Sequence, residues 1–158
     1  MKFAFVFLFV VLFVELSLAQ SPQRPSFSIK RSTDQIKIDG VFDEASWKDA
    51  EMIDQLIQQF PYDTSRARAR TEYKLTYDDH FLYVSGIAYD NVPGKYVVSS
   101  LRRDFRGPGL DGMSIVLDPF QDVTNGFFFG LSPAGVQREG LISNGYIQRE
   151  DLNLSWDN

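Results

Sequence analysis

The sequence contains no cysteine, and this absence removes several kinds of chemistry at once. No disulfide, thiolate metal site, cysteine nucleophile or lipid-modified cysteine is available to the chain. Histidine is nearly as scarce, because His80 is the only one and has no second imidazole with which to build a metal site or a charge-relay pair. We therefore predict that His80 is a solvated turn residue and not a catalyst.

Clustered positive charge and the sequence templates of common enzymes are also missing. The net charge is −5 and there is no block of Lys and Arg, which argues against nucleic acid as a partner. The sequence has no Gly-x-Ser-x-Gly elbow, phosphate-binding loop, dinucleotide fingerprint or His-Glu-x-x-His motif. Nothing in these residues therefore supports catalysis within this segment.

Residues 1–19 have the pattern of a secretory signal peptide. Lys2 precedes an unbroken apolar run from Phe3 to Val14, and the small residues that end at Ala19 suit cleavage. The run is short for a membrane-spanning helix, so a cleaved signal is preferred to the alternative of a retained anchor. We expect an exported protein in the periplasm, at the outer membrane or secreted. A polar linker is expected at 20–29 and one domain at 30–158.

The rest of the sequence alternates apolar and polar residues in short segments separated by turn residues, which is typical of an all-β sandwich. The segment 71–90 predicts a hairpin that turns at Asp78-Asp79-His80. A second hairpin is expected at 127–139, where Ser-Pro-Ala-Gly gives Gly135 freedom to take a positive φ.

Shorter elements are expected around these two hairpins. A helical turn at 43–50 is predicted to start at Asp43 as its capping residue, with Trp47 pointing inward to close one end of the sandwich. Further strands are expected at 36–38, at about 54–60 and at 113–117.

Acidic side chains in the second half of the domain have two interpretations. Asp104, Asp118 and Asp122 surround one predicted strand. They either cap turns and loops or assemble a calcium site, since hard cations take several oxygens from loop aspartates and carbonyls. No loop follows the spacing of a calcium hand, so calcium is the only cofactor kept open.

Arginine side chains also allow two interpretations. Arg66, Arg68 and Arg70 alternate with alanine, which at the period of a strand places three cations on one face. That face is either solvated or a patch for an acidic glycan. Arg102 and Arg103 are expected to make local ion pairs next to Asp104, although arginine also suits recognition of sugar hydroxyls and carboxylates.

Four segments occur in an order that resembles a family 9 carbohydrate-binding module. They are IDGVFDEASWKDA at 38–50, RTEYKLTYDDHFLYVSGIAYD at 70–90, LDGMSIVLDPF at 110–120 and FFFGLSPAGVQREG at 127–140. More specifically, the chain resembles the version found at the N-terminus of large exported proteins of Gram-negative bacteria with a β-rich, barrel-type C-terminal region. The resemblance implies an antiparallel, jelly-roll-like β-sandwich, sugar binding, and attachment to glycoside hydrolases such as xylanases.

The same resemblance implies a sugar site that this sequence fills only in part. Characterised members hold a sugar end between two tryptophans, with a Glu on the strand that here follows Asp111. Pro108 or Gly109 replaces the first tryptophan, Ser114 replaces the Glu, and Trp156 corresponds loosely to the second tryptophan. The residues expected to bind carbohydrate are Trp156, Arg102, Arg103, Asp111 and Ser114.

The family closes its sandwich with further strands after the region that matches Trp156. The resemblance therefore implies a domain that lacks its last strands here and is prone to aggregate through an open edge.

Three hypotheses follow for the function. The chain is an exported accessory module that binds xylan- or cellulose-type polysaccharide, a docking domain of an outer-membrane protein that has lost the sugar site, or part of a glycoside hydrolase with its active site elsewhere. The expected partners are a polysaccharide or oligosaccharide and a downstream domain of the same protein.

Overall fold

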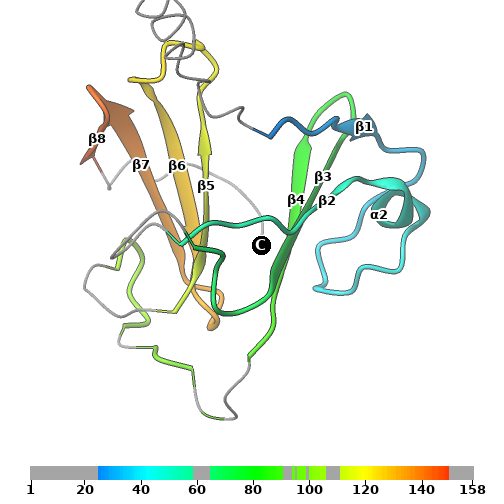
Figure 1. Ribbon diagram of the computed structural model, residues 1–158, viewed down its shortest axis with the longest axis horizontal. Coiled ribbons are helices and arrows are strands. Elements are labelled where there is room, and N and C mark those ends of the chain that lie inside the picture. Colours follow the sequence, from blue (N-terminus) through cyan, green and yellow to red (C-terminus); the bar gives the residue numbers. More distant parts are fainter. Residues whose placement is uncertain are drawn as a thin grey trace, which may run out of the picture.

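The computed structural model describes residues 25–58, 65–90, 94, 96–98, 100–105 and 111–149, and they form two β-sheets with one short helix. The prediction of an all-β, sandwich-like fold with mainly antiparallel strands is confirmed (Figure 1). In chain order the elements are β1 (Lys30–Arg31), α2 (Ala45–Asp49), β2 (Met52–Ile53), β3 (Thr71–Tyr77), β4 (Leu82–Ala88), β5 (Met113–Leu117), β6 (Gly126–Leu131), β7 (Gln137–Ser143) and β8 (Tyr146–Arg149).

The first sheet, β1 to β4, is organised around β3. β4 pairs antiparallel along the whole of β3, from Thr71 opposite Ala88 to Tyr77 opposite Leu82. β1 pairs with the end of β3, and β2 pairs with its middle. Because β4 occupies one edge of β3, β1 and β2 lie one after the other along its other edge. The predicted hairpin at 71–90 is confirmed, and Asp78 closes its turn by accepting the backbone N–H groups of His80 and Phe81.

The second sheet is an antiparallel meander in the order β5, β6, β7, β8. Ile115 lies opposite Phe129, which lies opposite Glu139, so these three side chains share one face of the sheet. Gly135 has a φ of +72° in the turn between β6 and β7, as predicted for this hairpin. The strand expected at 113–117 is also confirmed.

The two sheets approach each other closely where β4 carries Gly86. A side chain at Gly86 would collide with the end of Met113 on β5, at 2.2 Å from its Cε atom, and would touch the ring of Tyr73. Burial raises the pKa of the Tyr73 phenol, and its hydrogen bond with the backbone of Ser114 opposes this shift. The faces of the sheets that include Tyr73 and Met113 are therefore the inner faces of the sandwich.

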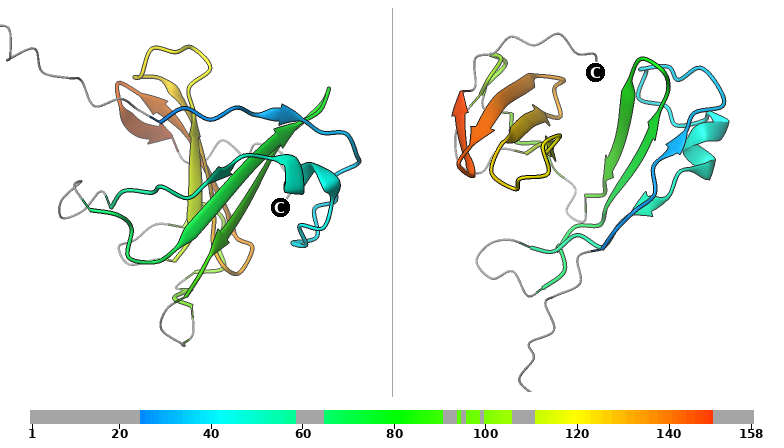
Figure 2. Two further views of the ribbon diagram at one scale, coloured as in Figure 1. Left: turned by 45° about the vertical axis from the view of Figure 1, so that its right-hand side comes forward. Right: turned by 90° about the horizontal axis from the view of Figure 1, so that it is seen from above.

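The best-buried apolar side chains lie around α2 and not between the sheets. Ile36, Trp47 and Ala50 are buried, and Trp47 keeps only 4% of its surface exposed. Figures 1 and 2 show α2 on the side of the first sheet that faces away from the second sheet. The prediction that Trp47 is a core residue is confirmed, but its expected place at one end of the sandwich is wrong, because its helix covers an outer face.

The start of α2 is capped from a distance. The helix lies at the expected place, but its N-cap residue is Glu44 and not Asp43, and the Glu44 side chain makes no capping hydrogen bond. Asp34 instead accepts the N–H groups of Ala45 at 2.8 Å and Ser46 at 3.2 Å. These bonds lower the pKa of Asp34, with the side-chain hydroxyl of Ser46 as the largest cause.

Two short predicted strands are not found among the described residues, and three observed strands, β1, β2 and β8, were not predicted. Residues 36–38 do not form a strand, and neither do residues 54–58 of the strand expected at about 54–60, whose last two residues lie outside the described ones. Ile57 makes only an isolated bridge to Arg66. β8 follows a tight turn at Asn144-Gly145 and extends the second sheet. In the part of the chain that the structure describes, no helix has the length and apolar character needed to span a membrane.

Candidate functional site

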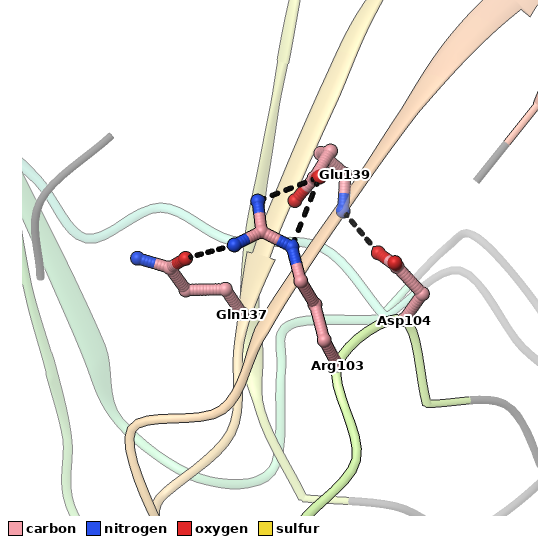
Figure 3. Close-up of polar contacts among 4 residues, drawn as sticks. All are labelled: Arg103, Asp104, Gln137 and Glu139. Carbon is pink, nitrogen blue, oxygen red and sulfur yellow. Dashed lines mark hydrogen bonds and ion pairs between the residues drawn. The ribbon is translucent and has the colours of Figure 1, made fainter. Parts of the chain in front are cut away.

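A cluster of polar contacts joins Arg103 and Asp104 to β7 (Figure 3). Arg103 donates to Oε1 of Glu139 from Nε at 3.1 Å and from Nη2 at 2.7 Å, and to Oε1 of Gln137 from Nη1 at 2.8 Å. The Glu139 side chain is fully buried, whereas 36% of the Arg103 side chain is exposed. The buried carboxylate therefore has its counter-charge at the protein surface.

Asp104 extends this cluster along the edge of β7. Its backbone N–H donates to the Gln137 carbonyl at 3.0 Å, and its carboxylate accepts the N–H of Glu139 at 3.2 Å. Asp104 has a φ of +57°, a left-handed conformation that aspartate adopts more readily than most residues. Asp104 thus supplies hydrogen-bond partners for backbone groups of Gln137 and Glu139. These groups lie just before the part of β7 that pairs with β8.

The remaining predicted sugar-binding residues do not converge on this cluster. Ser114 is exposed and lies opposite Gly130 on β6, on the outer face of the second sheet, whereas Glu139 belongs to the inner face. Arg102 is exposed and its backbone N–H donates to Ser100. Asp111 is exposed and accepts the N–H of Val97 at 2.7 Å. Trp156, Pro108 and Gly109 lie outside the described residues.

The aspartates considered for calcium are divided between two ends of the second sheet. Asp104 lies beside the start of β7, whereas Asp118 and Asp122 lie in the loop between β5 and β6, next to the end of β7. Both loop carboxylates accept backbone N–H groups of their own loop. Within the described ranges no three His, Cys, Asp or Glu residues gather around a common point, so the structure does not assemble the expected set.

The outer face of the second sheet carries a different group of side chains. Ser114, Gly130 and Arg138 lie in register across β5, β6 and β7. The ring of Phe128 extends over Gly130, 3.2 Å from where a Cβ would be, and the Arg138 guanidinium lies 5.1 Å from the centre of that ring. An aromatic ring and a guanidinium thus lie at Gly130, between Arg138 and the predicted residue Ser114.

The arginines at 66–70 do not form a strand face. Arg66, Arg68 and Arg70 are all exposed, but the segment is not a regular strand. Arg70 makes an ion pair with Glu72 and lies 4.8 Å from the centre of the Tyr89 ring. The charge of Arg70 is therefore at least partly balanced, which weakens the idea of a patch for an acidic glycan.

The sequence pattern could have identified Glu139 as a buried charge, but it does not show which residue pairs with it. Glu139 follows the alternation of its strand onto the inner face, where a charged residue is expected only if it is paired. The local ion pairs predicted for Arg102 and Arg103 next to Asp104 are not found among the described residues: Arg103 pairs with Glu139, far along the chain, and Asp104 bonds to backbone groups. His80 is exposed in its turn, as predicted.

No family model, curated protein or solved structure matches the chain. The resemblance to the family 9 carbohydrate-binding module therefore stays a prediction.

Proposed function

We propose that the chain is an exported, non-catalytic module that binds carbohydrate and attaches a larger protein to a polysaccharide of the xylan or cellulose type. The observation that carries the proposal is the group of Ser114, Phe128 and Arg138 on the outer face of the second sheet. Sugar sites combine an aromatic surface, for the apolar C–H face of the sugar, with hydrogen-bonding groups for its hydroxyls. The two-sheet fold agrees with the sandwich that the sequence resemblance implies.

Arg103 and Arg102 have different parts in this proposal. Arg103 is bound to Glu139 and Gln137, so its first role is to hold the 100–105 segment on β7. Arg102 and Asp111 are exposed and stay candidates for contacts at the margin of the site. Trp156 remains the candidate for sugar stacking, which by analogy with nucleotide bases contributes about 1–3 kcal/mol per ring.

Affinity electrophoresis through gels that contain soluble xylan or hydroxyethylcellulose tests the proposal. The protein is expected to be retarded in at least one gel. Arg138→Gln and Ser114→Ala should each weaken the retardation several-fold, because they remove hydrogen-bonding groups from the same face. Val116→Thr is the matched control, since Val116 is exposed on the same strand and the same face. An absence of retardation in every gel, with Trp156→Ala indistinguishable from the parent, would exclude the proposal.

The second candidate function is that of a docking domain that keeps the fold and has lost the sugar site. It is favoured by several large apolar side chains that point into solvent, among them Phe120, Val123 and Tyr146. A protein that binds no polysaccharide but co-purifies with its own downstream region, expressed as a separate chain, would support this alternative.

The third hypothesis, a glycoside hydrolase with its active site outside this chain, predicts hydrolysis only when that further region is attached.

A further inference from the structure

The second sheet carries a hollow of about 560 Å³ at the end where β6 begins and β7 ends. The residues that line it are Phe120, Asp122, Asn125, Gly126, Phe127, Leu141, Ile142 and Ser143. Four of them are large and apolar, and none is a lysine or an arginine. The hollow is separate from the Arg103 cluster, which lies at the other end of β7.

The loop that borders the hollow, residues 118–125, is fixed by its own carboxylates. Asp118 accepts the N–H of Val123 at 2.9 Å. Asp122 accepts the N–H groups of Thr124 at 2.9 Å and Asn125 at 2.7 Å. The carbonyl of Thr124 accepts the N–H of Gly145 at 2.9 Å, which ties the loop to the turn between β7 and β8. The loop is therefore a built surface with a defined shape.

This surface displays large apolar side chains to solvent. Phe120 is 66% exposed, Val123 is 72% exposed, and Tyr146, next to Gly145, is 73% exposed. Val123 also has a φ of +63°, a conformation that is strained for a β-branched residue. Strain of this kind persists only where the surrounding bonds impose it, and it is concentrated at functional surfaces. Exposed apolar groups on one loop and on the turn tied to it, beside a hollow that Phe120 lines, are typical of a site of protein contact.

The charge around the hollow limits what can bind there. Hydrogen bonds from the Asn125 side chain and from the backbone N–H groups of Asn125 and Thr124 lower the pKa of Asp122 to about 2, so this carboxylate stays negative at physiological pH. Asp118 adds a second carboxylate to the same loop. An anionic lipid surface would be repelled, and the few polar groups of the lining suit a sugar poorly. A basic polypeptide with apolar side chains satisfies both features.

We propose that the 118–125 loop and its hollow form a docking surface for a polypeptide segment that inserts a large apolar side chain flanked by lysine or arginine. The apolar side chain would enter between Phe120, Phe127 and Leu141, and the basic residues would approach Asp122. This surface is independent of the proposed sugar site, because it uses other residues at another part of the second sheet.

Fluorescence anisotropy with labelled synthetic peptides tests the proposal. The binding probe is a heptapeptide in which leucine and tryptophan alternate with lysine; the comparison peptides replace lysine with glutamate or the apolar residues with serine. The basic apolar peptide is expected to bind at least tenfold more tightly than either comparison peptide. Phe120→Ala and Ser143→Lys should each reduce this binding at least tenfold, the first by removing apolar contact and the second by adding a positive charge at the hollow.

The matched control is Phe81→Ala, because Phe81 is 63% exposed in the turn between β3 and β4 and has no part in the hollow. This variant should bind the basic apolar peptide like the parent. Equal losses for Phe81→Ala and Phe120→Ala, or equal binding of all three peptides, would overturn the proposal as non-specific adhesion. Co-sedimentation with phosphatidylcholine vesicles that is lost in Phe120→Ala would overturn it in favour of a membrane contact.

Discussion

Arg103 donates through both Nε and Nη2 to one oxygen of Glu139, a residue whose side chain is completely buried. The two residues differ in their access to water, since more than a third of the Arg103 side chain is exposed. Removing one partner of a buried ion pair leaves the other without compensation, and the cost depends on whether that partner can reach solvent. The pair should therefore respond asymmetrically to substitution.

Arg103→Met is expected to lower the free energy of unfolding by about 3–5 kcal/mol, because it leaves the Glu139 carboxylate buried without its counter-charge. Glu139→Leu should cost less, since the Arg103 guanidinium can turn to water. The double variant should be more stable than the sum of the two single effects predicts. Urea denaturation of the parent, the two single variants and the double variant gives the double-mutant cycle. Additive effects, or a larger cost for Glu139→Leu, would contradict this account.

The elements that could be predicted are those whose local pattern determines them. The hairpin of β3 and β4 alternates apolar and polar residues on both sides of a turn that Asp78 closes with its own side chain. β1 and β2 have two residues each and exist because the edge of β3 offers backbone partners to them. Such strands depend on tertiary structure, and no periodicity can develop over two residues.

The candidate site was less predictable for a related physical reason. The sequence places Ser114 and Glu139 on their strands, but their faces depend on register, and one residue of register separates the outer face from the inner. The pairing of Arg103 with Glu139 depends on how a loop packs against β7, and a local pattern does not contain that information. Likewise, Asp34 caps α2 from 11 residues before Ala45, where local rules favoured Asp43.

Trp47→Ala is expected to lower the free energy of unfolding by about 3–5 kcal/mol, as truncations of large buried aromatics do. Trp47 is 4% exposed and meets the ring of Phe42 edge-on at 5.9 Å. Its indole N–H has no hydrogen-bond partner among the described residues, so Trp47→Phe should cost clearly less than the alanine variant. Thermal and urea unfolding compare the two. Polysaccharide retardation of the folded alanine variant should be unchanged, because α2 lies on the outer side of the other sheet.

Acidification is expected to destabilise the fold at pH values below about 4. The pKa values of Asp34, Asp78 and Asp122 are lowered in the folded chain by hydrogen bonds, that of Asp122 to about 2. A carboxyl with a lower pKa when folded contributes stability above its unfolded value, and this contribution is lost as pH falls through the folded pKa. The melting temperature should therefore fall between about pH 4 and pH 2.

Asp34→Asn and Asp43→Asn separate the observed helix cap from the predicted one. The first should lower the melting temperature at pH 7 and flatten its dependence on pH below 4, because the capping carboxylate of α2 is gone. The second should do neither, since the N–H groups at the start of α2 donate to Asp34 and not to Asp43. The reverse ranking of the two variants would show that the cap is assigned to the wrong residue.

The protein is expected to self-associate through the edge of β4. This strand has seven residues without a charge, and in the described part of the chain it pairs only with β3. Exposed, uncharged edges of this kind recruit further strands. Ile87→Lys should raise the monomer fraction in size-exclusion chromatography with light scattering. Ile38→Lys, at an exposed apolar residue outside any strand, is the control and should leave that fraction unchanged.

Gly126 and Gly86 both lie close to neighbouring atoms, but the neighbour is backbone at Gly126 and a flexible side chain at Gly86. A Cβ at Gly126 would lie 2.4 Å from the backbone carbonyl oxygen of Leu117, whereas one at Gly86 would meet only the flexible end of Met113 and the ring of Tyr73. The carbonyl can move only if β5 separates from β6, while the Met113 side chain can adopt another rotamer. Gly126→Ala is therefore expected to cost about 3 kcal/mol or more, and Gly86→Ala about 1 kcal/mol, at the two ends of the usual range for overpacking. Urea denaturation midpoints test this order, and a greater loss for Gly86→Ala would mean that contact between the sheets, and not spacing within the second sheet, limits the packing of this fold.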